Sequence, residues 1–175
     1  MFETTIHWVR QVEPHRLGLM ARPRGGDGLT DEIEGWRAAS VDIVVSLLAS
    51  HEIRELELEA EGRLCIERGI DFRRFPIPDR GTPASAREAA AFIDQLHADL
   101  VAGKAVVIHC RAGIGRTGLV AACLLHDLAV PVADLFHVLS RARGMDMPDT
   151  NAQIRWVEAR CAASADRAKA ERPVA

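Results

Sequence analysis

Residues 104–118 read KAVVIHCRAGIGRTG, and this stretch decides the fold. Residues 105–108 form a short, uncharged run rich in β-branched side chains, which is typical of a strand buried on both faces. Glycines then recur, and an apolar run with helical character begins at Leu119. The stretch therefore predicts a buried strand, a glycine-bearing loop and a helix, with Cys110 where the strand ends.

A loop that leads into a helix N-terminus directs unpaired backbone N–H groups into one hollow, to which the helix dipole adds partial positive charge. Such a hollow binds a phosphate dianion and favours the thiolate of Cys110 over its thiol. Arg116 can aim a planar guanidinium over the hollow for bidentate contact with phosphate. Thr117 can donate its hydroxyl to the thiolate, and Gly113 and Gly115 let the backbone close around a ligand.

Residues 109–118, HCRAGIGRTG, resemble the signature of the cysteine-dependent protein tyrosine and dual-specificity phosphatases, which is His-Cys, five residues, Arg and Ser or Thr. The resemblance includes the flanking His109, the inner glycines and the Arg-Thr-Gly exit, and among the family it is nearest to the small dual-specificity enzymes, including the kinase-associated kind. It implies Cys110 as nucleophile, with Arg116 and Thr117 as catalytic partners. It also implies that the signature loop binds phosphate through Arg111, Ala112, Gly113, Ile114, Gly115 and Arg116.

The same resemblance implies a general acid on a loop about thirty residues before the cysteine, because an expelled alkoxide or phenoxide needs a proton. Asp79 lies 31 positions before Cys110, in the Pro-rich loop 76–83. Asp71 and Asp94 are rivals, but each lies in or beside a predicted regular element. We therefore predict Asp79 as the acid, in a loop whose Ile-Pro-Asp replaces the Trp-Pro-Asp of tyrosine-specific members.

Gln153 has two interpretations. Thr150-x-x-Gln153 resembles the glutamine loop that positions the hydrolytic water in some family members. The same spacing is a capping box, in which the glutamine side chain reaches back to the Thr150 N–H. His109 is expected to support the signature loop and the thiolate.

Strands alternate with helices along the chain, which predicts an α/β fold with a mainly parallel central sheet flanked by helices. The phosphatase resemblance implies the same architecture. Thr30, Ser50 and Thr82 are predicted to cap helices. We expect one catalytic domain over residues 1–165 and a frayed tail over 166–175. The predicted strands are 6–9 and 17–21, both at an edge and perhaps in a hairpin, and then 41–48, 70–75 and 105–108.

The composition is that of an ordinary globular chain of 175 residues, with 48% hydrophobic and 27% charged residues. A net charge of −3 argues against nucleic acid as a main partner. No apolar run approaches a membrane span, and no signal peptide is evident. The four cysteines lack metal-site spacing. We therefore expect a reduced, cytoplasmic monomer with no metal and no cofactor.

Three functions fit these residues. The first is a metal-independent phosphatase acting on phosphotyrosine, and also phosphoserine and phosphothreonine, in proteins. The second keeps the chemistry but takes a phosphoinositide or inositol phosphate as substrate. The third is a phosphate-binding pseudophosphatase, although such proteins usually lack the Cys, the Arg or the Asp that this chain retains. The absence of Tyr and the single basic residue, Arg111, at the variable loop positions favour phosphoproteins. Whether Cys65 or Cys123 can form a disulfide with Cys110 stays open.

Overall fold

The computed structural model describes residues 4–170 and contains one five-stranded sheet. The strand order is β1-β2-β5-β3-β4. All neighbouring strands are parallel except the antiparallel pair of β1 and β2. The predicted fold class, a mainly parallel sheet in an α/β fold, is therefore confirmed. The strands are β1 (His7–Trp8), β2 (Leu17–Met20), β3 (Ile43–Ser46), β4 (Asp71–Arg74) and β5 (Val106–His109).

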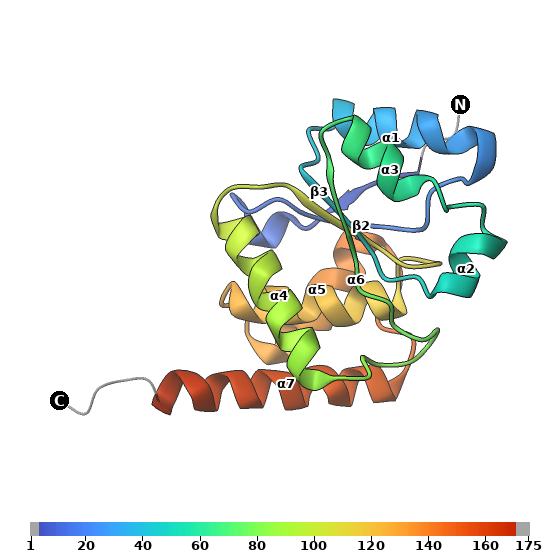
Figure 1. Cartoon of the computed structure of the whole chain (residues 1–175). Coiled ribbons are helices and arrows are strands. Elements are labelled where there is room, and N and C mark those ends of the chain that lie inside the picture. The colour runs from blue at the N-terminus through green and yellow to red at the C-terminus, as the bar shows by residue number, and fades with distance from the viewer. Residues whose placement is uncertain (1–3, 171–175) are drawn as a thin grey trace.

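Helices cover both faces of the sheet (Figure 1). Helices α1 and α3 lie on one face, and α4, α5, α6 and α7 lie on the other. Three short 3-10 turns, η1 (Arg10–Val12), η2 (Gly26–Gly28) and η3 (Val132–Asp134), join these elements. The helices are α1 (Leu29–Ala38), α2 (Ser50–Glu55), α3 (Glu61–Glu67), α4 (Ala86–Val101), α5 (Gly115–Asp127), α6 (Leu135–Arg143) and α7 (Asn151–Ala170).

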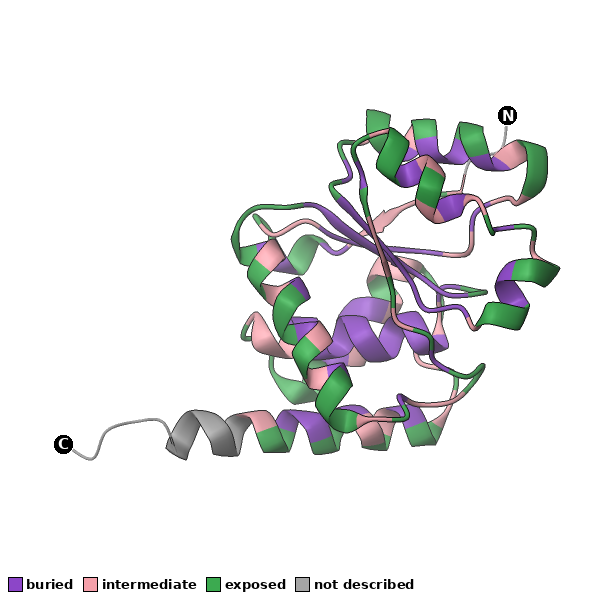
Figure 2. Cartoon of the chain, viewed as in Figure 1, coloured by how far each residue is buried: buried purple, intermediate pink, exposed green. Residues whose placement is uncertain are grey.

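The central strands divide their side chains between two apolar cores because successive residues of a strand point to opposite faces. Along β3, Ile43 and Val45 join the core under α4 to α7, whereas Val44 joins the core under α1 and α3. Along β5, Val106 and Ile108 likewise join the core under α4 to α7, and Val107 joins the core under α1 and α3. The inner strands are accordingly buried along their length (Figure 2).

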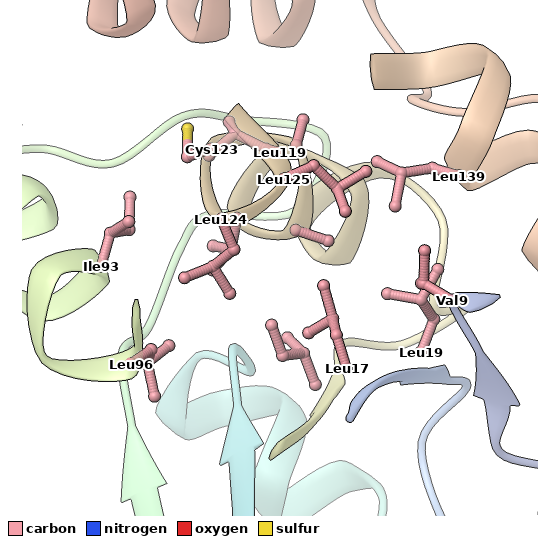
Figure 3. Packing of buried hydrophobic residues seen from close by; sticks show 14 of the residues in the cluster. Val9, Leu17, Leu19, Ile93, Leu96, Leu119, Cys123, Leu124, Leu125 and Leu139 are labelled. Atoms are coloured by element: carbon pink, nitrogen blue, oxygen red, sulfur yellow. The ribbon is translucent and has the colours of Figure 1, made fainter. Parts of the chain in front are cut away.

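Helix α5 is the centre of the larger core. Its residues from Gly115 to Leu125 are all buried. Leu119, Leu124 and Leu125 lie between the sheet and the flanking helices, as Figure 3 shows with residues of β2, α4 and α6 around them. A helix apolar on every side must be enclosed, which holds its N-terminus rigidly in place.

Several boundaries differ from the predictions. Strands 6–9 and 17–21 were both predicted at an edge, but of these only β1 is an edge strand. Strand β2 lies inside the sheet because it pairs with β5 on its other side. Helix α1 begins at Leu29, which places Thr30 inside the helix rather than at its cap. Ser50 is likewise the first residue of α2, and Ala49 is the N-cap. The predicted cap at Thr82 is also wrong, because Ser85 caps α4 and accepts a hydrogen bond from the Glu88 N–H at 3.2 Å.

At the C-terminal end, the described part of helix α7 runs to Ala170, so it includes residues 166–170 of the predicted tail. The rest of the predicted tail, 171–175, lies outside the described residues. Within the described residues, no helix is long and apolar enough to cross a membrane.

The carboxyl ends of the parallel strands lie side by side along one edge of the sheet. Met20 of β2 and Ser46 of β3 both pair with His109, the last residue of β5. The segments that follow these strands therefore meet at this edge, where ligands bind in open α/β sheets. Cys110 lies at this place.

Candidate active site

The signature loop, residues 110–116, connects β5 to α5. Helix α5 begins at Gly115, earlier than the apolar run suggested, and its first intrahelical bond runs from the Gly118 N–H to the Ile114 carbonyl at 2.8 Å. The N–H groups of Gly115, Arg116 and Thr117 therefore have no partner within the helix. Together with the helix dipole, they form an anion-binding end beside Cys110.

Gly113 is required by the shape of the loop. Its φ of +69° lies in the left-handed region, and a Cβ added there would lie 2.1 Å from the Met20 carbonyl oxygen. The signature loop thus packs directly against the end of β2, and no larger residue fits at this position.

The outer side of the loop holds its carbonyl groups away from the hollow. The Arg22 N–H donates to the Arg111 carbonyl at 3.1 Å. The Arg143 guanidinium donates to the carbonyls of Ala112 at 3.0 Å and Gly113 at 3.3 Å. Because N–H and C=O point in opposite directions across a peptide, these bonds turn the following N–H groups inward. Arg143 was not identified from the sequence.

The same arginine contacts the edge strand. Arg143 Nη1 lies 3.2 Å from His7 Nε2. Burial, and then the charge of Arg143, lower the pKa of His7 below its ordinary value. His7 is therefore held neutral beside the guanidinium that supports the loop.

Arg116 is buried and makes four hydrogen bonds. It forms a bidentate pair with Glu52, at 2.6 and 2.9 Å, and donates to the Ile77 carbonyl at 3.2 Å and to Asp79 Oδ1 at 2.9 Å. Burial alone would lower the pKa of Arg116, but the hydrogen bond to Glu52 and the charges of Cys110, Glu52 and Asp79 raise it. The guanidinium is therefore a fixed positive charge close enough to Cys110 for the two groups to interact electrostatically.

Glu52 of α2 is the buried counter-ion that sequence reasoning missed. It also accepts a hydrogen bond from the Ala49 N–H at 2.9 Å. Burial would raise the pKa of Glu52, but the hydrogen bonds from Arg116 and Ala49 lower it below its ordinary value. Its position in the sequence was one indication that Glu52 could reach the site. Glu52 lies in the helix that follows β3, and β3 neighbours β5 in the sheet.

Asp79 lies in the loop of residues 76–83, called here the acid loop, as predicted for a Pro-rich segment between β4 and α4. Its side chain is 57% exposed, in contrast to the 2% of Arg116 to which it is bonded. The structure thus brings Cys110, Arg116 and Asp79 together, with the carboxyl group on the solvent side where a leaving group would depart.

The other predicted residues occupy distinct places. The Thr117 hydroxyl is buried and has no hydrogen-bond partner among the described residues. Arg111 pairs at the rim with Glu55 of α2 at 2.5 Å. His109 is buried, with Nδ1 3.4 Å from the Cys110 carbonyl and Nε2 3.0 Å from Glu61 Oε1 of α3. Their catalytic roles stay predictions.

Gln153 and Thr150 form both bonds of a capping box. The Gln153 N–H donates to Thr150 Oγ1 at 3.2 Å, and the Thr150 N–H donates to Gln153 Oε1 at 3.3 Å. The Gln153 side chain is fully buried, and Nε2 donates to the Gly81 carbonyl of the acid loop at 3.1 Å. The amide thus contacts the acid loop, which the sequence did not indicate.

Metal ligands do not gather here. Among the residues that the structure describes, no group of three or more His, Cys, Asp or Glu side chains could hold a metal ion. The positive charge at the site comes from Arg116 and from the N-terminus of α5.

Comparison with known families agrees with this geometry. A family described as "Polymorphic toxin system, DSP-PTPase phosphatase" matches residues 18–128, from β2 through the end of α5. The chain belongs to this family. The resemblance to the small dual-specificity type of cysteine phosphatase is therefore confirmed, and the chain carries a dual-specificity phosphatase domain.

Two characterised relatives share part of the sequence. Cyclin-dependent kinase inhibitor 3 of Sus scrofa is 42% identical over 65 residues, which are 37% of this chain and 30% of that protein. The protein of the same name from Rattus norvegicus is 42% identical over 57 residues, or 33% of this chain and 26% of that protein. The matches thus span less than a third of the length of these relatives.

Solved structures share the fold over nearly the whole chain. Kinase associated phosphatase, with its catalytic-site cysteine replaced by serine, superposes with a TM-score of 0.82 at 22% identity, covering 98% of this chain and 99% of that one. Tk-PTP in its active form gives 0.72 at 21% identity, with 90% and 96% covered. PTPMT1 in complex with PI(5)P gives 0.75 at 16% identity, with 93% and 98% covered.

Proposed function

We propose that the protein is a metal-independent phosphatase that hydrolyses phosphate monoesters on protein side chains through a phosphocysteine intermediate. The observation that carries the proposal is the contact of one buried arginine, Arg116, with the predicted acid Asp79 beside Cys110. A nucleophile, a fixed positive charge and a proton donor around one anion-binding hollow are the parts that this reaction needs.

In the first step, the Cys110 thiolate attacks phosphorus, an S–P bond forms and the ester P–O bond breaks. The departing oxygen takes a proton from the Asp79 carboxyl group. Arg116 and the N–H groups of the signature loop bind the phosphoryl oxygens, whose charge they stabilise in the transition state. The leaving alcohol or phenol is released toward solvent, on the exposed side of Asp79.

In the second step, water attacks the phosphocysteine, a new P–O bond forms and the S–P bond breaks. Asp79, now a carboxylate, accepts a proton from that water. Inorganic phosphate leaves and the Cys110 thiolate is restored, so that no external oxidant, reductant or metal enters the balance.

Phosphoproteins are the proposed substrates, with phosphotyrosine, phosphoserine and phosphothreonine all accepted. Three observations support this choice: the dual-specificity family, the exposed Asp79, and the pairing of Arg111, the basic residue at the variable positions of the signature loop, with Glu55. We also propose that the protein acts as a monomer in the cytoplasm, where a nucleophilic thiol stays reduced.

The test begins with the nucleophile. Turnover of a small aryl phosphate by the wild type in the presence of a chelator should disappear in Cys110→Ser, while the circular dichroism spectrum and the binding of a phosphate mimic remain. Activity retained by Cys110→Ser, or wild-type activity lost to the chelator, would contradict the mechanism.

The general acid is tested with leaving groups of different basicity. Asp79→Asn should slow esters with poor leaving groups by about 10²–10³, near the usual contribution of a general acid, and activated esters much less. Equal slowing of all esters would make Asp79 structural.

Substrate class is tested by kcat/KM on phosphotyrosine and phosphothreonine peptides and on a soluble phosphoinositide. We expect the peptides to be preferred. A preference for the phosphoinositide by more than about tenfold, which is 1.4 kcal/mol in transition-state binding, would assign the second substrate class and leave the catalytic residues unchanged.

A further inference from the structure

The acid loop is fixed on both sides of Asp79. Before it, the buried Ile77 donates its N–H to the Leu47 carbonyl at 3.1 Å and accepts a bond from Arg116 at 3.2 Å. After it, the Gly81 carbonyl accepts the bond from Gln153 Nε2 at 3.1 Å. Asp79 thus lies on a short segment whose two ends are tied to different parts of the fold.

The segment between these anchors is a tight turn. The Gly81 N–H donates to the Pro78 carbonyl at 2.9 Å, which leaves Asp79 and Arg80 at the centre of the turn. Arg80 has a φ of +54°, in the left-handed region that non-glycine residues rarely adopt. Such a conformation persists only when the surrounding structure holds it. The bond from Gln153 is one of the contacts that hold it.

The orientation of the Gln153 amide follows from its two neighbours. One end faces the Thr150 N–H, which can only donate, and the other faces the Gly81 carbonyl, which can only accept. A flipped amide would place nitrogen against N–H and oxygen against oxygen. Each end of the amide therefore has a partner that fixes its orientation, with Oε1 on the helix cap and Nε2 on the acid loop.

Gln153 also packs against the phosphate-binding end of α5. A Cβ added at Gly115 would lie 3.0 Å from Gln153 Nε2 and 2.2 Å from Asp149 Oδ2. Because Gly115 has no side chain, the start of α7 can approach the first residue of α5. One buried side chain therefore contacts both the acid loop and the helix that binds phosphate.

We propose that Gln153 is a positioning residue that holds the acid loop so that Asp79 faces the leaving-group oxygen. This inference rests on the proposed function and gives Gln153 a different role from that of orienting the hydrolytic water. It predicts a specific kinetic signature, because the formation of the phosphocysteine depends on a residue that acts through the general acid most strongly when the leaving group needs a proton.

Gln153→Glu distinguishes the acceptor role of the amide from its donor role. The carboxylate can still accept from the Thr150 N–H, but it cannot donate to the Gly81 carbonyl. We expect esters with poor leaving groups to slow by about 10- to 100-fold, the scale of a misplaced catalytic group, and activated esters by less than about threefold. Gln153→Met removes the donor without adding charge and should show the same dependence on the leaving group.

Two controls complete the experiment. Thr150→Val weakens the helix cap but leaves Nε2 and Gly81 in place, so it should lower the melting temperature without any leaving-group dependence. The double variant Gln153→Glu with Asp79→Asn should be no slower on poor leaving groups than Asp79→Asn alone, because both changes act through the same carboxyl group. Hydrogen exchange at residues 79–81 should increase in Gln153→Met, which reports the loosened loop even if Gln153→Glu does not fold.

The results that would overturn the inference differ from those that would overturn the proposed function. Uniform slowing across leaving groups, accumulation of the phosphocysteine with an unchanged rate of its formation from esters with poor leaving groups, or additive effects in the double variant would reject Gln153 as the positioning residue for Asp79. The proposed function fails instead if the wild type does not turn over aryl phosphates, or if Cys110→Ser retains activity.

Discussion

The Arg116 and Glu52 side chains form a buried ion pair, 2% and 1% exposed, within the catalytic site. Such a pair is costly to break from one side, because the remaining charge stays buried without compensation. Glu52→Gln should therefore lower the free energy of unfolding by about 3 kcal/mol and reduce kcat/KM. Chemical denaturation at neutral pH measures the first effect and steady-state kinetics the second.

The pH dependence of this variant follows from the lowered pKa of Glu52. A carboxyl group with a lowered folded-state pKa stabilises the fold fully above its ordinary value of 4.5 and loses that contribution as pH falls through the folded value. The stability difference between wild type and Glu52→Gln should thus be constant near neutrality and shrink below pH 4.5. A difference that grows on acidification would contradict the assigned ionic pair.

Arg143 binds the signature loop from outside through two carbonyl groups. Replacing it with Met removes charge-assisted bonds worth about 1.5 kcal/mol together, after allowance for partial exposure, so affinity for orthovanadate should fall by about tenfold. Arg143→Lys should recover part of the loss, since an ammonium cannot match the planar fork. Arg141→Met, on the exposed side of the same helix, is the matched control and should leave inhibition by vanadate unchanged.

Among the elements, helix α4 shows how one cap decides where a helix begins. Ser85 accepts the bond from the Glu88 N–H, although Thr82 followed by Pro83 is the stronger sequence signal. Ser85→Ala should cost about 1 kcal/mol of unfolding free energy, and Thr82→Ala much less. Thermal or chemical denaturation of the two variants compares them directly. A larger loss from Thr82→Ala would move the cap to the predicted position.

The strand, loop and helix from β5 to α5 could be predicted because each signal is local. The β-branched run, the glycines and the apolar helix occupy one continuous stretch, and Asp79 followed from its place in the resemblance. The position of β2 inside the sheet could not be read from its own residues, because pairing with β5 joins segments far apart in the sequence. The same limit applies to Glu52, Arg143 and the bond from Gln153, which are contacts between distant segments.

Across the whole molecule, all four cysteines are buried, but only Cys110 lies in the signature loop. Burial raises the pKa of Cys65 to about 12 and of Cys161 to about 11, and it raises the pKa of Cys123 still further. These three remain neutral thiols through physiological pH and are poor nucleophiles. Iodoacetamide at neutral pH should therefore modify Cys110 alone in the folded protein, and bound phosphate should protect it.

Peptide mapping by mass spectrometry checks this result, with the unfolded protein as the control in which all four cysteines react.

The positions of the cysteines also predict how the protein responds to oxidation. Cys65 lies in the core under α1 and α3, and Cys123 in the core under α4 to α7. Because burial raises the pKa of the Cys65 and Cys123 thiols and so suppresses their thiolates, we expect mild peroxide to leave Cys110 without a disulfide partner. A Cys110–Cys65 or Cys110–Cys123 crosslink would contradict this.

The candidate active site lies at the carboxyl ends of the parallel strands. The opposite edge of the sheet, at their amino ends, has no assigned chemistry. Gly69 and Gly103 precede β4 and β5 at that opposite edge, both have positive φ, and a Cβ at either would meet nothing within 4 Å. These two turns are therefore natural attachment points for an inserted affinity tag or fluorophore. A molecule immobilised through either turn would present its active site outward, toward the solution and any phosphoprotein in it.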